Sequence, residues 1–176
     1  SPSDYPSSGG STFVSSATGE TWTINGGATI VQRTQLYFDG TNDYVKSAAF
    51  SLSQPENVYF VGSQVTFTDG ATFIDGGTFN TMRWLQKTTS PNTSMYSGGA
   101  GDTNVNTQWP IKTIGVGSLV FSGASSSNRY NRGTPTTGGN PGTSSRNGLT
   151  VGAAANGSGY GNITVSEILI YDTVAH

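Results

Sequence analysis

The chain has 176 residues, enough for one domain with a sizeable core, and a formal net charge of −2 with only 10% charged residues. Its eight basic residues are scattered and form no patch for phosphate contacts, which argues against nucleic-acid binding. The absence of cysteine excludes disulfides and a thiol nucleophile, and the lack of an apolar run near 18 residues argues against membrane insertion.

The first 18 residues are rich in Ser, Pro and Gly and carry few apolar side chains. Such a stretch cannot bury enough apolar area to fold by itself. We therefore predict an extended arm or linker over 1–18 and one folded domain over 19–176.

Strand signals recur along the domain, separated by turns rich in Gly, Ser, Asn and Pro, and no segment has the pattern of a helix. The predicted strands are Thr21–Ile24, Gln35–Phe38, Asp43–Lys46, Asn57–Val65, Thr72–Asp75, Thr81–Lys87, Ile111–Phe121, Asn128–Asn131, Leu149–Ala153 and Asn162–Tyr171. Their spacing is typical of an all-β sandwich. The segments Val58–Val61 and Ile168–Tyr171 are apolar on both faces, which predicts central strands covered by the opposing sheet and by loops.

Two motifs at opposite ends of the domain point to a family. The first, Leu36–Val45, contains Phe-Asp-Gly-Thr-Asn-Asp-Tyr-Val, and the second is Val165–Tyr171; a strand ending at Phe121–Ser126 lies between them. In this order the motifs resemble the LamG-like branch of the concanavalin A-like lectin/glucanase superfamily. The resemblance implies a two-sheet antiparallel jelly-roll sandwich. The low charge and Ser/Thr/Gly-rich character are similar to modules of phage and bacterial surface proteins, which implies an extracellular or virion-surface location.

The sequence lacks the catalytic pattern of hydrolases in this superfamily. Those enzymes carry Glu-x-Asp-x-x-Glu on one strand, because retaining glycosidases in general need two carboxyl groups about 5 Å apart. Here Glu20, Glu56 and Glu167 are far apart in sequence, and no Asp follows two residues after any of them. The sole histidine, His176, is the last residue, a poor place for a general base. We therefore predict that the chain is not an enzyme.

The turn within the first motif offers oxygen ligands for a cation. Ca²⁺ takes six to eight oxygens, and Asp39, Asn42 and Asp43 could supply several of them. The resemblance also implies a possible calcium, because many relatives in the family hold one, often with ligands from other loops. The alternative is an ordinary Asp-Gly turn between two strands, in which the Asp side chains accept hydrogen bonds from backbone amides.

Sugar binding in this fold generally uses aromatic rings that stack on the sugar, together with polar side chains that bond its hydroxyls. Trp109 follows a Gly/Asn/Thr-rich segment, 98–108, that we predict to be a loop, so we expect its ring to be exposed. Trp84 fits either the core or the concave face. The candidate ligand-binding residues are Trp109, Tyr130, Arg83, Trp84, Tyr96, Asn131 and Tyr160.

Two function classes agree with these observations. The first is a non-catalytic carbohydrate-binding, adhesive module that attaches a virion or cell to surface glycans through many weak contacts. The second is a structural module of a phage particle or surface assembly, which would bind other virion or surface proteins rather than glycans.

Overall fold

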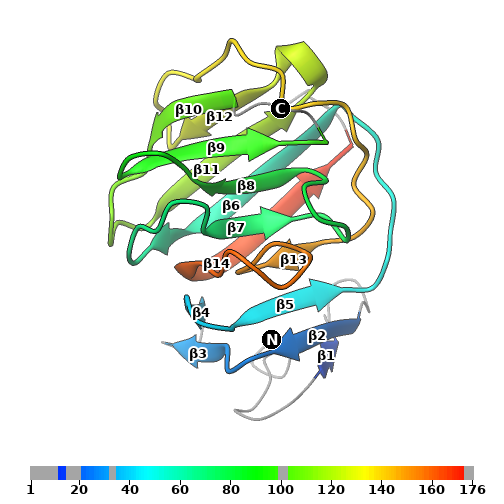
Figure 1. Cartoon of the computed structure of the whole chain (residues 1–176), viewed down its shortest axis with the longest axis vertical. Coiled ribbons are helices and arrows are strands. Elements are labelled where there is room, and N and C mark those ends of the chain that lie inside the picture. Colours follow the sequence, from blue (N-terminus) through cyan, green and yellow to red (C-terminus); the bar gives the residue numbers. More distant parts are fainter. Residues whose placement is uncertain (1–11, 15–20, 32–34, 99–102, 173–176) are drawn as a thin grey trace.

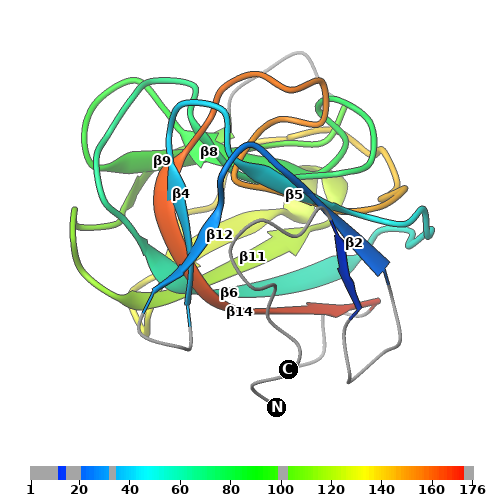
Figure 2. The ribbon, with the colours of Figure 1, turned by 90° about the horizontal axis from the view of Figure 1, so that it is seen from below.

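The computed structural model describes residues 12–14, 21–31, 35–98 and 103–172. Two antiparallel sheets pack face to face, one in front and one behind in Figure 1, and Figure 2 shows the two layers from below. The predicted jelly-roll sandwich is confirmed. Within the described ranges, the one helical element is the short 3-10 turn η2 (Gly123–Ser125), so no helix there could span a membrane.

The front layer is an eight-stranded sheet. In spatial order its strands are β1 (Thr12–Val14), β2 (Thr21–Asn25), β5 (Tyr44–Ser47), β13 (Thr150–Val151), β7 (Thr72–Asp75), β8 (Arg83–Gln86), β9 (Asn92–Tyr96) and β10 (Thr103–Gln108). The two residues of β13 pair with β5 on one side and with β7 on the other. Together with the backbone bonds from Ser47 N to the Leu149 carbonyl and from Gly152 N to the Phe73 carbonyl, these pairings join the three strands near the chain start to the other four.

The rear layer is a six-stranded sheet. In spatial order its strands are β12 (Ser127–Tyr130), β11 (Gly115–Phe121), β6 (Glu56–Gln64), β14 (Asn162–Tyr171), β4 (Gln35–Asp39) and β3 (Thr29–Val31). The long strands β6 and β14 lie in the middle, as their apolar sequences predict. Since side chains alternate along a strand, Val58 and Phe60 of β6 point between the sheets, whereas Tyr59 and Val61 point outward.

Aromatic rings fill the space between the sheets. Phe60 lies at their centre, with ring centroids 5.8 Å from Phe73, 5.3 Å from Trp84 and 5.8 Å from Trp109. Gly117 of β11 makes room for the two indoles, because a Cβ there would lie 2.7 Å from Trp84 and 2.8 Å from Trp109. A side chain at this position would force the rings apart, so the glycine is part of the core packing.

A buried ion pair fastens the rear sheet to the connection that precedes β13. Glu56 of β6 and Arg146 are both fully buried, and Arg146 Nη2 lies 2.7 Å from Glu56 Oε1. Arg146 Nε also donates to the same carboxylate at 2.7 and 3.0 Å. Burial raises the pKa of Glu56, and the nearby guanidinium lowers it by a smaller amount. Such a pair fixes geometry more than it adds stability.

Several strands escape the sequence analysis. β9 and β10 are polar and lack a clear alternation; β10 lies within 98–108, which we predicted to be a loop, and is instead a strand paired to β9. The short strands β1 and β3 were also missed. β1 lies within the predicted arm, 1–18, yet it pairs with β2, so these three residues belong to the sheet. The remainder of that arm is outside the described residues.

Candidate functional site

The outward face of the eight-stranded sheet is covered by two connections of the chain. Trp84 and Gln86 of β8 point into the sandwich, so Arg83 and Leu85 point outward, yet Leu85 is only 2% exposed. The connection from β7 to β8 and the one from β13 to β14 lie against this face. Gly159 of the second connection approaches so closely that a Cβ would lie 2.9 Å from Arg83 Nη2.

Arg83 is the centre of this covered face. Its Nε and Nη2 donate to Thr72 Oγ1 at 2.9 and 2.7 Å, Nη2 also donates to the Gly70 carbonyl at 2.7 Å, and Nη1 donates to Asn80 Oδ1 at 3.2 Å. The guanidinium carbon lies 5.3 Å from the centre of the Phe79 ring, within the range of a cation–π contact. We call Arg83, Thr72, Phe79 and Asn80 the Arg83 cluster.

Asp75, at the end of β7, anchors both covering connections. One carboxylate oxygen accepts from the Gly76 amide at 2.8 Å, and the other accepts from the amides of Asn80 and Ala155, each at 3.1 Å. Burial raises the pKa of Asp75, while the three amides and the charge of Arg83 lower it by smaller amounts. A buried carboxylate without an ion-pair partner in direct contact is thus held by backbone donors from two connections.

The β7–β8 connection has an unusual backbone that these contacts hold in place. Asn80 and Met82 have φ angles of 61° and 67°, which side chains other than Gly rarely adopt. Asn147 ties the connection down from outside, because its Oδ1 accepts from Thr78 N at 3.1 Å and from Thr81 Oγ1 at 3.1 Å. The fixed backbone positions the residue at its tip.

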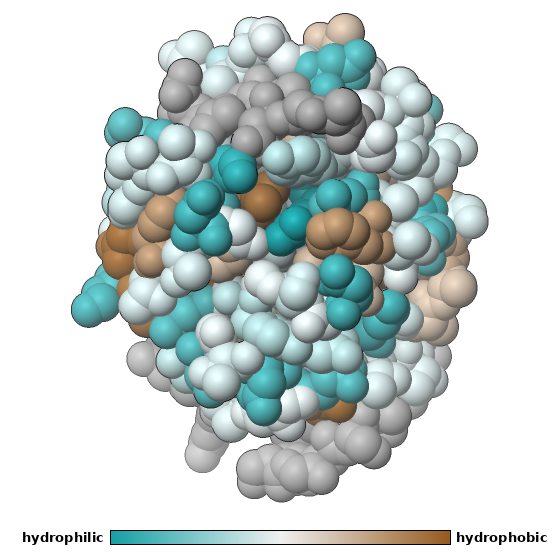
Figure 3. All heavy atoms as spheres, viewed as in Figure 1, coloured by the Kyte–Doolittle hydropathy of each residue, from teal (hydrophilic) through white to brown (hydrophobic). Residues whose placement is uncertain are grey.

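Phe79 is that residue, and 42% of its surface is exposed. Figure 3 views the molecule from this side and shows a largely hydrophilic to neutral surface with small hydrophobic groups. An exposed ring, held on a rigid loop and flanked by Arg83 and Asn80, can pack on the apolar face of a sugar while the amide bonds a hydroxyl.

Three of the predicted ligand-binding residues lie on this face. Arg83 and Tyr96 are directly paired across β8 and β9, so their side chains point the same way. Tyr160 follows Gly159 in the second covering connection, and its ring lies 6.3 Å from that of Tyr44. The sequence analysis missed Phe79 and Asp75. The available signal was the Gly76-Gly77 pair, which marks a turn with an aromatic residue close behind.

The other four candidates lie elsewhere. The expected exposure of Trp109 is wrong, since it is 1% exposed and packs in the core, where Trp84 is also fully buried. Tyr130 points into the sandwich with its ring 5.2 Å from Trp109. Asn131 is exposed at the end of β12, where its Oδ1 accepts from Val116 N at 2.8 Å. The aromatic rings were needed to fill the space between two wide sheets.

The predicted calcium ligands act as turn residues. Both oxygens of Asp43 accept backbone amides, one from Gly27 and the other from Asp39 at 3.1 Å. One oxygen of Asp39 accepts from the Thr41 amide at 2.7 Å. In the described part of the chain no three His, Cys, Asp or Glu side chains group to hold a metal. The hydrogen bonds of Asp39 and Asp43 match the alternative of a backbone-capping turn.

Comparison with known proteins gives structural matches only. No protein-family model matches the chain, and no curated protein matches it. It is similar to Trypanosoma rangeli sialidase in complex with the inhibitor DANA, with a TM-score of 0.66 and 13% identity over 94% of this chain and 29% of the sialidase. The sialidase in complex with sialic acid gives a TM-score of 0.63 and 12% identity over the same shares.

A second kind of match is the exoplasmic/lumenal domain of VIP36 in a form bound to Ca²⁺ and Man2. The TM-score is 0.54 with 8% identity, over 93% of this chain and 85% of that domain. At these identities the matches establish the two-sheet antiparallel β-sandwich fold. The chain spans less than a third of the sialidases that it matches.

The sialidase matches contradict the prediction that the chain is not an enzyme. That prediction used the missing pair of carboxylates, but sialidases use a tyrosine nucleophile and are an exception to the two-carboxylate rule. The missing pair therefore excludes only the commoner glycosidase pattern. The fold occurs within a sialidase chain and in a domain bound to Man2, and a fold by itself does not specify an activity.

Proposed function

We propose that the chain is a carbohydrate-binding module and that the Arg83 cluster holds the sugar. The observation that carries this proposal is the half-exposed Phe79 ring on a loop fixed by Asp75 and Asn147. Because the loop is already ordered, little conformational entropy is lost when a ligand binds. The sugar-bound forms of two structurally similar proteins support this class of ligand.

In this proposal a pyranose ring lies on the exposed part of Phe79, and its hydroxyls bond to Asn80 and to the Tyr96 side chain across the sheet. Arg83 contributes mainly by holding Thr72, Asn80 and the Phe79 ring in place, because most of its donors are already engaged. We expect weak binding at a single site, since the ligand would rest on a surface rather than in a deep cavity.

The test is a glycan-array screen of the purified chain, followed by titration of the best ligand against Phe79→Ala. We expect the variant to lose about tenfold or more in affinity, which corresponds to roughly 1.4 kcal/mol. Ile114→Ala is the matched control, because Ile114 is 59% exposed and lies outside the cluster. Equal binding by wild type and Phe79→Ala, or a blank array, would contradict the proposal.

Two further measurements use the same samples. Analysis for released sugar tests for enzyme activity on the bound glycan. Repeating the titration in EDTA tests for a metal, which the calcium in the VIP36 structure makes worth measuring. Loss of binding in EDTA would point to ligands other than Asp39, Asn42 and Asp43. Membership of the LamG branch, display on a virion or cell surface and an extracellular location stay predictions from the sequence.

A structural module that packs against other proteins is the second candidate. The observation in its favour is that Val116, Leu169 and Tyr171, all on the outer face of the six-stranded sheet, are 37–40% exposed. Exposed apolar groups of this kind can mark a protein interface. Sedimentation velocity over a range of concentrations would reveal self-association through this face.

A further inference from the structure

A pocket of about 180 Å³ opens on the outer face of the six-stranded sheet, on the opposite side of the molecule from the Arg83 cluster. Its floor consists of two rows of outward side chains that run across β6, β11 and β12. The first row is Asn57, Val120 and Ser127, and the second is Tyr59, Ser118 and Arg129.

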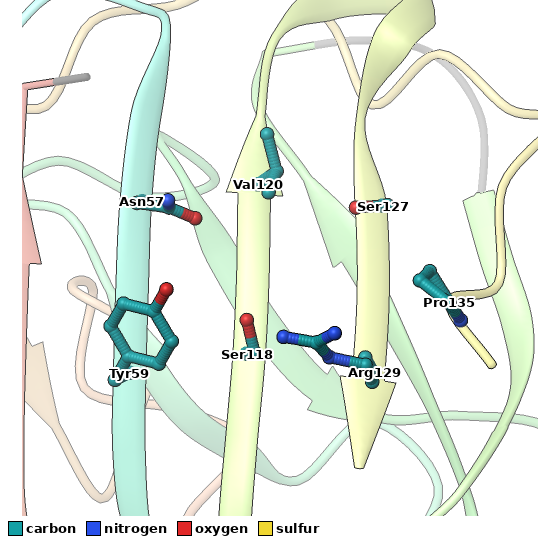
Figure 4. Close-up of a pocket in the computed structure, with 7 residues that line it drawn as sticks. All are labelled: Asn57, Tyr59, Ser118, Val120, Ser127, Arg129 and Pro135. Atoms are coloured by element: carbon teal, nitrogen blue, oxygen red, sulfur yellow. The ribbon is translucent and has the colours of Figure 1, made fainter. Parts of the chain in front are cut away.

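The pairing of the strands explains why this face is hollow. Ser118 of β11 is paired with Tyr59 on one side and with Arg129 on the other. Neighbouring strands lie about 4.8 Å apart, so a short side chain stands between two long ones whose backbones are roughly 10 Å apart. Pro135 forms a further wall beyond β12. Figure 4 shows the Arg129 guanidinium pointing from β12 toward β11 and the Tyr59 hydroxyl pointing in from β6.

Two buried polar atoms of opposite kind lack partners in this pocket. Asn57 is only 2% exposed, and its Oδ1, an acceptor, has no hydrogen bond. The Nε of Arg129, a donor, is likewise buried and has no hydrogen bond. Native structures leave few buried polar atoms unpaired, so two in one pocket call for an explanation. A ligand that supplies both a donor and an acceptor provides one.

The charge of the pocket indicates the kind of acceptor. Among the described residues, ion pairs join Lys87 to Asp69 and Arg146 to Glu56, so Arg129 has no acidic partner there. A guanidinium with a buried Nε is best satisfied by a planar anion, and a carboxylate matches its geometry. Asn57 Oδ1 needs a hydroxyl or another donor on the same ligand. The edge of the pocket is aromatic, with Tyr59 and Tyr171 in edge-to-face contact at 6.1 Å.

We propose that this pocket binds a carboxylated sugar unit. The carboxylate accepts from Arg129, a hydroxyl of the ring donates to Asn57 Oδ1, and the C–H face of the sugar packs against Tyr59. The pocket shares no residue with the Arg83 cluster, so the proposal does not depend on a glycan binding there. If both sites bind, the module contacts sugars on its two opposite faces.

The experiment is an NMR titration of the ¹⁵N-labelled chain with D-glucuronate, with D-glucose and acetate at matched concentrations. We expect glucuronate to shift the Nε–H resonance of Arg129 and the side-chain amide of Asn57. Glucose lacks the carboxylate and acetate lacks the ring hydroxyls, so each should bind about tenfold more weakly or worse. Equal binding of glucose would contradict the role of Arg129, and equal binding of acetate would contradict the role of the sugar.

The variants separate this pocket from the rest of the surface. Arg129→Met should abolish the shift of the Asn57 side-chain amide. Asn57→Asp should abolish the shift of the Arg129 Nε–H, because it places a carboxylate beside the bound anion while keeping the side-chain shape. Arg132→Met is the matched control, since Arg132 is an exposed arginine just beyond β12, and it should bind like wild type. Spectra of the free variants establish that they are folded.

Phe79→Ala should also bind glucuronate normally, so failure of the Arg83 cluster and failure of this pocket give different results. Binding that survives in both pocket variants would overturn the assignment of the site. Shifts at Arg129 and Asn57 that follow protein concentration alone would do so too, because they would make this face a contact between copies of the chain.

Discussion

The outer faces of the two sheets differ in what lies on them. On the eight-stranded sheet, the outward residues Leu85 and Ser94 are almost fully buried, and Gly159 of one covering connection lies close to Arg83. On the six-stranded sheet, the outward residues Leu169 and Tyr171 are 40% and 37% exposed. Outward side chains are therefore buried on one sheet and exposed on the other, although both sheets have the same alternation. The outward side chains of one sheet are buried in a second, outer core, whereas those of the other sheet reach solvent.

Breaking the ion pair between the rear sheet and the connection that precedes β13 should have the largest effect on stability. Glu56→Gln leaves the Arg146 charge buried without its partner, so we expect the free energy of unfolding to fall by about 3–5 kcal/mol. Chemical denaturation measures the change. The double variant Glu56→Met, Arg146→Met removes both charges and should recover most of the loss. If Glu56→Gln alone were neutral, the ion pair would not secure the connection that precedes β13.

A pair of leucine variants tests the two faces directly. Leu85→Ala should lower the free energy of unfolding by about 2–3 kcal/mol, because it opens a cavity beneath the covering connections. Leu169→Ala makes the same chemical change at an outward position of the other sheet and should stay within about 0.5 kcal/mol of wild type. Similar losses in the two variants, measured by urea denaturation, would mean that both faces are equally covered.

Asp75→Asn should weaken the attachment of both covering connections to the eight-stranded sheet. An amide can accept at only one end, so at least one of the three backbone donors loses its acceptor, and we expect a loss of about 1–3 kcal/mol. Asp172→Asn, at an exposed position, is the control and should be neutral. A neutral Asp75→Asn would show that the connections are held mainly by other contacts.

The stability difference between wild type and Asp75→Asn should depend on pH. The pKa of Asp75 is raised in the folded state, so the folded chain holds this proton over a range of pH in which the unfolded chain has released it. Stability from this group is therefore greatest below the unfolded pKa and is lost as the pH rises through the folded one. The advantage of wild type over Asp75→Asn should shrink across that window, which denaturation at a series of pH values can follow.

The architecture could be predicted because most strands have a recognisable signal in their own local sequence. The segment Val58–Val61 is a continuous apolar run and Asp39-Gly40 marks a turn, so β6 and β4 were found within one or two residues. β10 could not be found in this way. Its Thr, Asn and Gln side chains carry no apolar pattern, and it becomes a strand through pairing at the edge next to β9.

The candidate site was harder to predict from the sequence than the fold was. Arg83 and Tyr96 were named as single residues, but their pairing depends on the register of β8 and β9, which no local pattern contains. Trp109 was misplaced because a tryptophan after a polar segment gives the same local signal whether it turns inward or outward. The expected cover over β6 and β14 was wrong for a similar reason, since apolar residues on both faces do not specify what packs on the outer one.

The eight-stranded sheet has few backbone hydrogen bonds where the two-residue strand β13 connects β5 and β7. Residues 149–152 supply the backbone contacts that join β5 and β7, so the two parts of the sheet are connected by one short segment. The strands on either side of β13 can separate locally, because few hydrogen bonds have to break together. Slow opening of the sheet should therefore occur at β13, with β2 and β5 moving as one unit. The strands β7 to β9 would keep the Arg83 cluster intact.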